Sequence, residues 1–376
     1  MTAFDVDRRR EVLVGIGARG ACLEQLLAYN ESRFDTGSVS RDGPWPLPDE
    51  PFVETWAGYV ARAAETGVLA ALGADLVQLA FPIREGISTT PEYRAVVRRG
   101  EPPAATALAS GLALRAPEAL RLELRATAAG RVPVLVAPER DDFESLVRAL
   151  VRRNEPVPIA PSLGAVMVAG YANWGRIRAH RRRWAAEHPA GHWPAEFERL
   201  TADPARYQDR FVIVSEGPYS AVPAAELGVG DATWRRLSLE IRIRHECTHY
   251  CTKRLLGSMR NNLLDEIVAD FMALVGATGR FRADWFARFM GIEAAPLLRP
   301  GGRLELYRGD PPLDDEALAT LGVLVARAAA TLEAFAAAVT PDDGPAGDAR
   351  LLLALATQSL EAIAAEDGLE RLVAHY

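Results

Sequence analysis

The sequence predicts an α+β fold: a mixed α/β N-terminal part around a small sheet, followed by a mostly helical second half. Short apolar runs bounded by turn residues alternate with helix-length segments between residues 77 and 215. After residue 231 the chain is rich in Ala and Leu, which favour helix. We therefore divide the chain into an N-terminal helical segment (1–75), an α/β region (76–230) and a helical region (231–376). Whether the three pack as one compact unit is left open.

Composition and charge are those of an ordinary globular protein. The 376 residues are 49% hydrophobic and 25% charged, with a net charge of −7, which argues against a general nucleic-acid or membrane-surface binder. No apolar run approaches the roughly 18–20 residues of a membrane-spanning helix. The N-terminus lacks a signal-peptide layout, because acids precede its basic run. We expect a cytoplasmic protein that binds neither nucleic acid nor membrane; its oligomeric state is open.

The first helical stretch, 6–30, contains Gly15, Gly17 and Gly20 in the spacing G-x-G-x-x-G. A dinucleotide-binding loop would need a strand before these glycines and a second strand about 20 residues later. Residues 31–43 are polar and rich in turn formers, so a bend between two helices is the better interpretation. An oxidoreductase that binds a nicotinamide cofactor is therefore a minor alternative.

Helices are expected over 52–72, over 91–99 after a Thr90 cap, and over 143–153. The strand candidates have alternating or continuous apolar patterns; they are 77–83, 120–126, 132–136, 157–160, 165–168 and 211–215. The segment 174–187 is a strongly basic helix. It could contact an acidic ligand or RNA, although a solvated face is the simpler interpretation. Cys22, Cys247 and Cys251 are too few for a disulfide framework, and we expect small buried side chains.

A metal site is predicted by the run His245-Glu246-Cys247-Thr248-His249, which has the pattern H-E-x-x-H. On a helix, His245 and His249 share one face with Cβ atoms about 5–6 Å apart, which suits two nitrogens binding one Zn²⁺. Glu246 is rotated about 100° from His245 and can reach water at the metal without binding the metal. The preceding residues alternate like a strand, but a strand would separate the two histidines by about 13 Å. Metal binding therefore requires helix from His245 onward.

The next segment supplies two acids at the right distance for a helical hairpin. Gly257 is a plausible C-cap for the first helix, and Asn261 or Asn262 can cap a second one. A chain that returns antiparallel brings Glu266 and Asp270 back beside the histidines. Glu266 is placed to be the third ligand. Asp270 lies one helical turn further along and is placed to accept a hydrogen bond from a ligand histidine.

These residues resemble the gluzincin metallohydrolases, the thermolysin-like group in which H-E-x-x-H is followed by E-x-x-x-D on the next helix. The resemblance covers about 30 residues and implies zinc ligands His245, His249 and Glu266, general base Glu246, and Asp270 as the partner of His245. The chain departs from the group at Asp265, where Asn is common before the ligand Glu. It also shows no counterpart of the downstream His or Tyr that stabilises the oxyanion.

The sequence thus predicts a zinc-dependent hydrolase with one Zn²⁺, acting on a peptide or another amide-containing substrate. The alternatives are a small-molecule metallohydrolase and a catalytically degenerate, metal-stabilised binding protein. In gluzincins an edge strand near this point holds the substrate. The region 211–220, which contains the strand candidate 211–215, could have that role, or the strand could be a plain core strand. The conceivable oxyanion donors are Tyr219, Tyr250, Tyr307 and His375.

Overall fold

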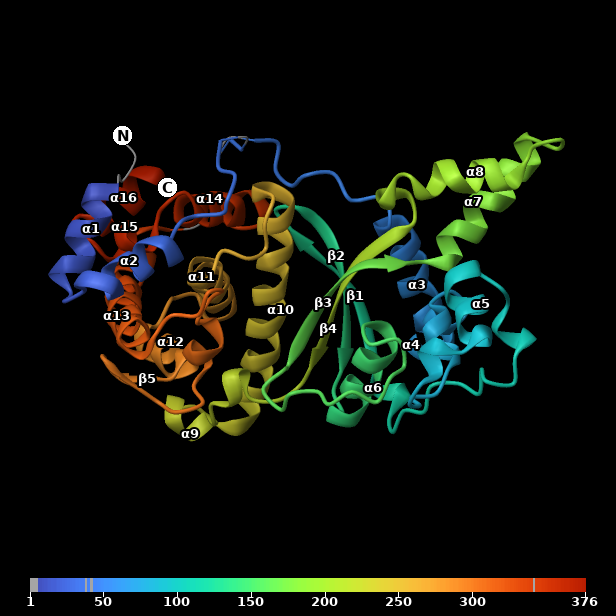
Figure 1. Cartoon of the computed structure of the whole chain (residues 1–376), viewed down its shortest axis with the longest axis horizontal. Coiled ribbons are helices and arrows are strands. Elements are labelled where there is room, and N and C mark those ends of the chain that lie inside the picture. Colours follow the sequence, from blue (N-terminus) through green and yellow to red (C-terminus); the bar gives the residue numbers. More distant parts are fainter. Residues whose placement is uncertain (1–5, 38, 41–42, 341) are drawn as a thin grey trace. The chain divides into compact units, whose positions relative to one another are not determined.

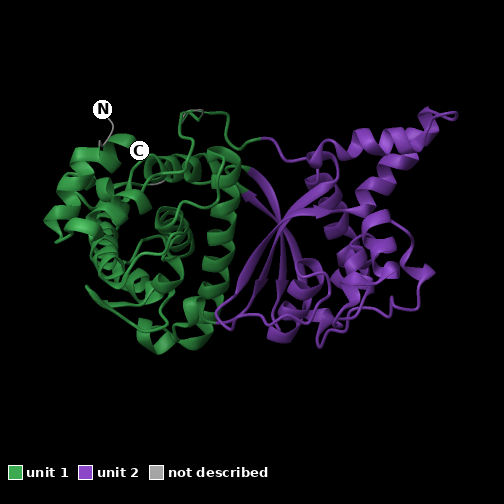
Figure 2. Ribbon diagram, in the orientation of Figure 1, with its two compact units in different colours: residues 1–47, 127–129, 218–376 green, residues 48–126, 130–217 purple. Residues whose placement is uncertain are grey.

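The computed structural model describes residues 6–37, 39–40, 43–340 and 342–376, and the chain forms two compact units (Figure 2). Unit 1 comprises residues 1–47, 127–129 and 218–376, and unit 2 comprises residues 48–126 and 130–217. The fold is α+β, as predicted. Residues 75 and 230, where composition suggested boundaries, lie inside unit 2 and unit 1 respectively.

Unit 2 contains a mixed sheet (Figure 1). Among the described residues it has four strands in the order β1-β2-β4-β3. Their bounds are Arg121–Thr127 (β1), Gly130–Ala137 (β2), Ala165–Ala172 (β3) and Gln208–Ser215 (β4). Strand β4 pairs parallel with β2 and antiparallel with β3. It is an interior strand, so the suggested substrate-binding edge in the region 211–220 is wrong for its strand part, 211–215, and the plain core strand is right.

Two other segments predicted as strands are not strands in the described chain. In each of them, side chains donate hydrogen bonds to backbone carbonyl groups, which are then not available for strand pairing. Residues 77–80 form a 3₁₀-helix, and the Asn154 amide donates to the carbonyls of Gln78 (3.1 Å) and Phe81 (3.0 Å). Around 157–160, Arg148 donates to the Val157 carbonyl and Arg140 to that of Ala160. The conformation of both apolar runs thus depends on side-chain hydrogen bonds, which the hydrophobic periodicity of the sequence does not reveal.

Helix α6 packs against β2, β3 and β4, and α3 packs against β2. The helices of unit 2 are α3 (Val53–Thr66), α4 (Val68–Gly73), α5 (Pro91–Arg99), α6 (Arg140–Leu150), α7 (Trp174–Glu187) and α8 (Trp193–Thr201), with 3₁₀ turns η1 (Val77–Ala80), η2 (Ile87–Thr89), η3 (Pro103–Ala105), η4 (Pro117–Ala119) and η5 (Pro204–Arg206). The predicted cap of α5 is confirmed, since Thr90 accepts from the Tyr93 amide. The single helix expected over 52–72 is broken at Gly67, whose φ of 82° favours glycine.

Unit 1 is mostly helical. Its elements are α1 (Val6–Gly15), α2 (Gly20–Tyr29), η6 (Tyr219–Ala221), α9 (Ala224–Leu227), α10 (Asp231–Leu256), α11 (Leu263–Thr278), α12 (Ala283–Met290), β5 (Ile292–Ala294), β6 (Leu297–Leu298), η7 (Arg303–Tyr307), α13 (Asp315–Ala338), α14 (Pro345–Ala356), α15 (Leu360–Ala364) and α16 (Gly368–His375). Residues Gly15 to Gly20 join α1 to α2, so the predicted bend between helices is confirmed.

Helix α13 is, within the described chain, the one helix long and apolar enough to span a membrane by length and composition. It packs against α2, α12, α15 and α16, and Phe335 stacks on Phe271 of α11 with ring centroids 5.9 Å apart. The core helix of a globular unit passes the same test of length and composition. Its apolar composition is therefore accounted for by this packing.

Helices α10 and α11 pack side by side as the predicted hairpin (Figure 1). Gly257 ends α10 in the left-handed conformation, as expected. Neither asparagine caps α11 with its side chain, which corrects the prediction. Instead both side chains bind the N-terminal segment: Asn261 Oδ1 accepts from the Arg33 amide (2.7 Å), and Asn262 Nδ2 donates to the Tyr29 carbonyl (2.5 Å).

Candidate metal centre

Helix α10 carries both histidines on one buried face. The alternating run before His245 is helical, so the ambiguity of that run resolves in favour of helix. His245 and His249 are 6% and 7% exposed, and their Nε2 atoms lie 3.0 Å apart. The fixed i, i+4 spacing of the helix thus aims two ring nitrogens at one point.

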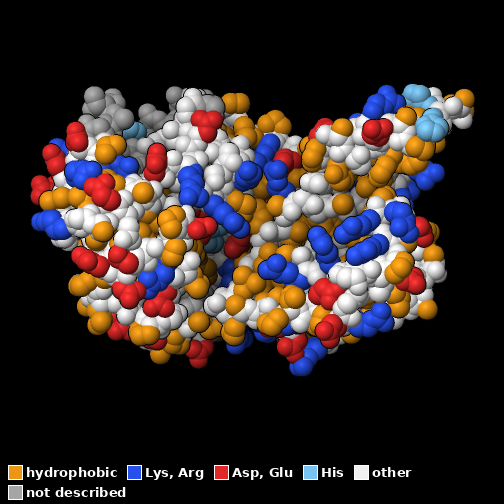
Figure 3. Space-filling model, viewed as in Figure 1, with side chains coloured by type: hydrophobic (Ala, Val, Ile, Leu, Met, Phe, Trp, Pro, Cys, Tyr) orange, Lys and Arg blue, Asp and Glu red, His pale blue; other side chains and the backbone are white. Residues whose placement is uncertain are grey.

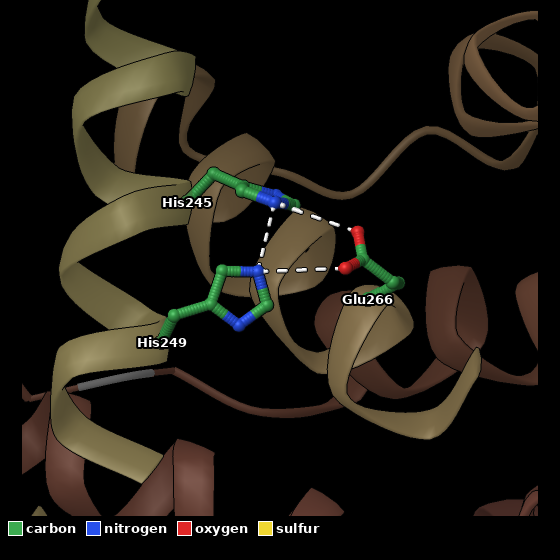
Figure 4. Close-up of side chains that lie close together, drawn as sticks. All are labelled: His245, His249 and Glu266. Atoms are coloured by element: carbon green, nitrogen blue, oxygen red, sulfur yellow. Dashed lines mark hydrogen bonds and ion pairs between the residues drawn. The ribbon is translucent and has the colours of Figure 1, made fainter. Parts of the chain in front are cut away.

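Glu266 on α11 completes a group of three (Figure 4). Its Oε2 lies 3.5 Å from His245 Nε2, and its Oε1 lies 3.6 Å from His249 Nε2. Ligand atoms about 2.0–2.1 Å from a tetrahedral Zn²⁺ lie roughly 3.3–3.4 Å from one another. The three observed separations are close to that value, so the donor set fits a small dication in size and in chemistry.

The other ring nitrogen of each histidine, Nδ1, lies near a carboxylate. His245 Nδ1 lies 2.9 Å from Asp270 Oδ1, and His249 Nδ1 lies 3.4 Å from Asp265 Oδ2. The contact with Asp270 places a proton on His245 Nδ1, so Nε2 is the atom of that ring that can bind metal. Burial lowers the pKa of His245, but Asp270 and Glu266 raise it overall, so without metal a proton on His245 Nε2 can be donated to His249 Nε2, 3.0 Å away. A dication at this point would take the place of that proton.

Asp265, the position that departs from the gluzincin pattern, lies beside the second ligand histidine. Its Oδ2 is within ion-pair distance of His249 Nδ1, although the described residues give that nitrogen no hydrogen bond of good geometry. Its Oδ1 accepts from the Asn261 amide at 2.5 Å. Burial, with Glu266 nearby, raises the pKa of Asp265 to about 7. Burial and the neighbouring His245 lower the pKa of His249 to about 4, which keeps its ring neutral.

Arg303 on η7 is the residue of the site that sequence reasoning missed. Its Nη2 donates to Glu266 Oε2 at 2.5 Å, and its Nη1 donates to Asp270 Oδ2 at 2.9 Å. Burial alone would raise the pKa of Asp270, but Arg303 and the hydrogen bond from His245 lower it to about 2. Arg303 and the two histidines likewise lower the pKa of Glu266 against the opposing effect of burial. Both acids are thus held as carboxylates.

Replacement of Arg303 by Met is expected to destabilise the metal-free protein by about 3–5 kcal/mol, because two buried carboxylates lose their counter-charge. Urea unfolding in the presence of a chelator measures this free energy. Arg308→Met is the matched control: Arg308 pairs with the exposed Asp315, and such pairs contribute about 0–1 kcal/mol. Equal stability of the two variants would contradict the role of Arg303.

Glu246 differs from its neighbours in having a free carboxylate. It follows His245 on α10 and is half-buried, whereas both ligand histidines are buried. Within the described part of the chain, no hydrogen bond or ion pair holds its side chain. Burial raises the pKa of Glu246, although His245 opposes the shift. A carboxylate of this kind, beside the three converging donors, is available to accept a proton.

The four conceivable oxyanion donors lie in different surroundings. Tyr219 is buried, and its hydroxyl donates to Asp270 Oδ1 at 2.5 Å and lies 2.9 Å from His245 Nδ1, so it supports the ligand rather than a substrate. Tyr250 is fully buried, and His375 binds the Arg371 carbonyl near the C-terminus. Tyr307 is half-buried, and its hydroxyl accepts from Arg303 Nε at 3.3 Å. Tyr307 is therefore the partly accessible donor beside the centre.

The cysteines stay outside the centre. Cys22, Cys247 and Cys251 form no disulfide and are buried, as predicted. Burial raises the pKa of Cys251, which keeps it a neutral thiol.

Comparison with known proteins gives the chain a family. The model of DUF7005, described as a family of unknown function, matches residues 11–367. No curated protein and no solved structure matches the chain. The matched region includes His245, Glu246, His249, Glu266 and Asp270, so the whole candidate centre lies inside it. Since the match spans almost the full length, the chain belongs to the DUF7005 family.

Proposed function

We propose that this protein is a zinc-dependent hydrolase that holds one Zn²⁺ through His245, His249 and Glu266. The observation that carries the proposal is the convergence of two imidazole nitrogens and one carboxylate, 3.0–3.6 Å apart, on two packed helices. Two nitrogens and one oxygen are a donor set that suits zinc and leaves a fourth position for water. The gluzincin resemblance of the same residues agrees with this assignment.

The chemistry divides among the residues of the chain. Zinc, when bound, supplies a Lewis acid that polarises water and the substrate carbonyl. Glu246 takes the proton from the attacking water and passes it to the leaving amine. Asp270 orients His245, and Arg303 keeps Asp270 and Glu266 ionised. The substrate class proposed is a peptide or another amide, since a carboxylate base beside a Lewis acid serves amide hydrolysis.

Tyr307 is the residue we assign to the developing oxyanion. Its hydroxyl lies beside Arg303 and is half-buried, so it can reach a substrate from the edge of the centre. We expect Tyr307→Phe to lower kcat about 10²-fold with little change in KM, because a lost oxyanion donor acts mainly in the transition state. Steady-state kinetics measure this split. A rise in KM with kcat unchanged would assign Tyr307 to ground-state binding instead.

Two measurements test the function as a whole. Elemental analysis of protein purified without added metal is expected to give one zinc per chain. Hydrolysis of peptide and N-acyl amide substrates is expected to stop on chelation and to return with zinc. A chain that holds no transition metal and does not respond to a chelator would overturn the proposal. Zinc without hydrolysis of any amide would favour the alternative, a metal-stabilised binding protein.

A further inference from the structure

A pocket of about 240 Å³ lies in unit 2, where the C-terminal end of α5 meets α7 and α8. It belongs to a different compact unit from the candidate metal centre, and the proposed hydrolase function makes no use of it. Its lining combines arginines with aromatic side chains: Arg98, Arg99, Arg178 and Arg181 with Trp174, Trp193 and Phe197. We call it the Arg/Trp pocket.

Four arginines line the Arg/Trp pocket, and for two of them the described residues provide no matching acid. Arg99 pairs with Glu101 and Arg178 with Asp75. For Arg98 and Arg181, by contrast, the described residues provide no carboxylate within ion-pair distance. No Asp or Glu is among the described residues of the lining. Like charges gathered in this way repel one another, and an anion at the pocket would relieve the repulsion.

Aromatic rings form the other part of the pocket. Trp174 and Phe197 stack with ring centroids 6.2 Å apart and an interplanar angle of 13°, and Trp193 lies 5.9 Å from Phe197. Trp193 and Phe197 are half-buried, so part of each ring remains accessible. The Arg181 guanidinium lies 5.2 Å from the centre of the Trp193 ring. A flat ring entering here meets aromatic surface beside cationic groups.

The floor of the pocket is fixed before any ligand arrives. Trp174 and Ile177 belong to the buried core formed with α5 and η1. Trp174 Nε1 donates to the Val97 carbonyl at 2.8 Å, which sets the angle of its ring. Gly100 has a φ of 72°, and a Cβ there would lie 2.2 Å from the Trp174 ring. A preformed floor lowers the entropic cost of binding.

We propose that the Arg/Trp pocket binds a small ligand with one flat aromatic ring and one anionic group, a phosphate or a carboxylate. The anion would be held by Arg98 and Arg181, whose planar guanidinium groups match either oxyanion. The volume suits one ring and one anion rather than a strand of RNA. The net charge of −7 also disfavours a long polyanion. Figure 3 shows Lys and Arg side chains gathered beside hydrophobic ones over the part of unit 2 that holds α5.

Calorimetric titration of the full chain with adenosine 5′-monophosphate and with benzoate tests the proposal and separates the two kinds of anion. At least one of these probes is expected to bind, while adenosine, which has the ring without the charge, and inorganic phosphate, which has the charge without the ring, bind at least about tenfold more weakly. Arg98→Gln and Arg181→Gln are each expected to weaken binding about tenfold, because each removes a charged hydrogen-bond donor.

The control is Arg182→Gln, an exposed arginine on the same helix that is not part of the lining. It is expected to leave affinity within about twofold. The proposal is overturned if neither probe binds, if adenosine binds as tightly as the monophosphate, or if Arg182→Gln weakens binding as much as Arg181→Gln. Tight binding of a single-stranded RNA by a chain that binds neither probe would also overturn it, in favour of a nucleic-acid surface.

Discussion

The Glu246→Gln variant is expected to retain one zinc per chain and to hydrolyse its substrate about 10²–10⁴-fold more slowly than the wild type. Glutamine has the shape of glutamate but cannot accept a proton, so the donor set of His245, His249 and Glu266 remains while the base is lost. Because no described residue binds the Glu246 carboxylate, the substitution breaks no internal hydrogen bond. The comparison of kcat with zinc content measures both halves of the expectation.

Glu240→Gln is the control for this substitution. Glu240 lies on the same helix and pairs with Arg244 at 2.6 Å on a half-buried face. Its replacement is expected to leave kcat within about twofold, as for a surface pair that contributes little. Full activity of Glu246→Gln would rule out Glu246 as the base, while loss of zinc in that variant would place Glu246 among the groups that hold the metal.

The His249→Ala variant is expected to lose zinc. One of three protein ligands disappears, so affinity should fall by more than the roughly 10–100-fold that loss of an outer hydrogen-bond partner costs. Zinc at 100 times its Kd should stabilise the wild type by about 2.7 kcal/mol and leave the variant almost unaffected. Thermal unfolding with and without zinc, together with elemental analysis, measures the difference.

His188→Ala supplies the comparison for the histidine substitution. His188 is exposed on the chain after α7 and contacts the Trp184 carbonyl. This variant should keep both its zinc and the stabilisation by zinc. If His249→Ala bound zinc as tightly as His188→Ala, the three-residue centre would be wrong.

The elements that could be predicted from the sequence are those that depend on patterns within one short segment. Strands β1, β2, β3 and β4 follow from alternating or continuous apolar runs, and the α10–α11 hairpin follows from the spacing of His245, His249, Glu266 and Asp270. The failures at 77–83 and 157–160 have the opposite origin. In those two segments the backbone carbonyls accept hydrogen bonds from side chains elsewhere in the sequence, those of Asn154, Arg140 and Arg148. The local hydrophobic pattern does not show such contacts.

The centre was predictable to the same extent. The proposed ligands, the proposed base and Asp270 lie within 26 residues of each other, at spacings that helix geometry converts into proximity. Arg303 follows Asp270 by 33 residues. No spacing rule connects it to the helices.

The attachment of the α10–α11 turn to residues near the start of the chain bears on any attempt to isolate the centre. A fragment beginning at residue 218 would contain all three ligands, Glu246 and Arg303. It would nevertheless lack the Arg33 amide and the Tyr29 carbonyl that Asn261 and Asn262 bind. Released from these anchors, the two helices would sample a wider range of separations, and such a miniature would hold zinc more weakly than the intact polypeptide.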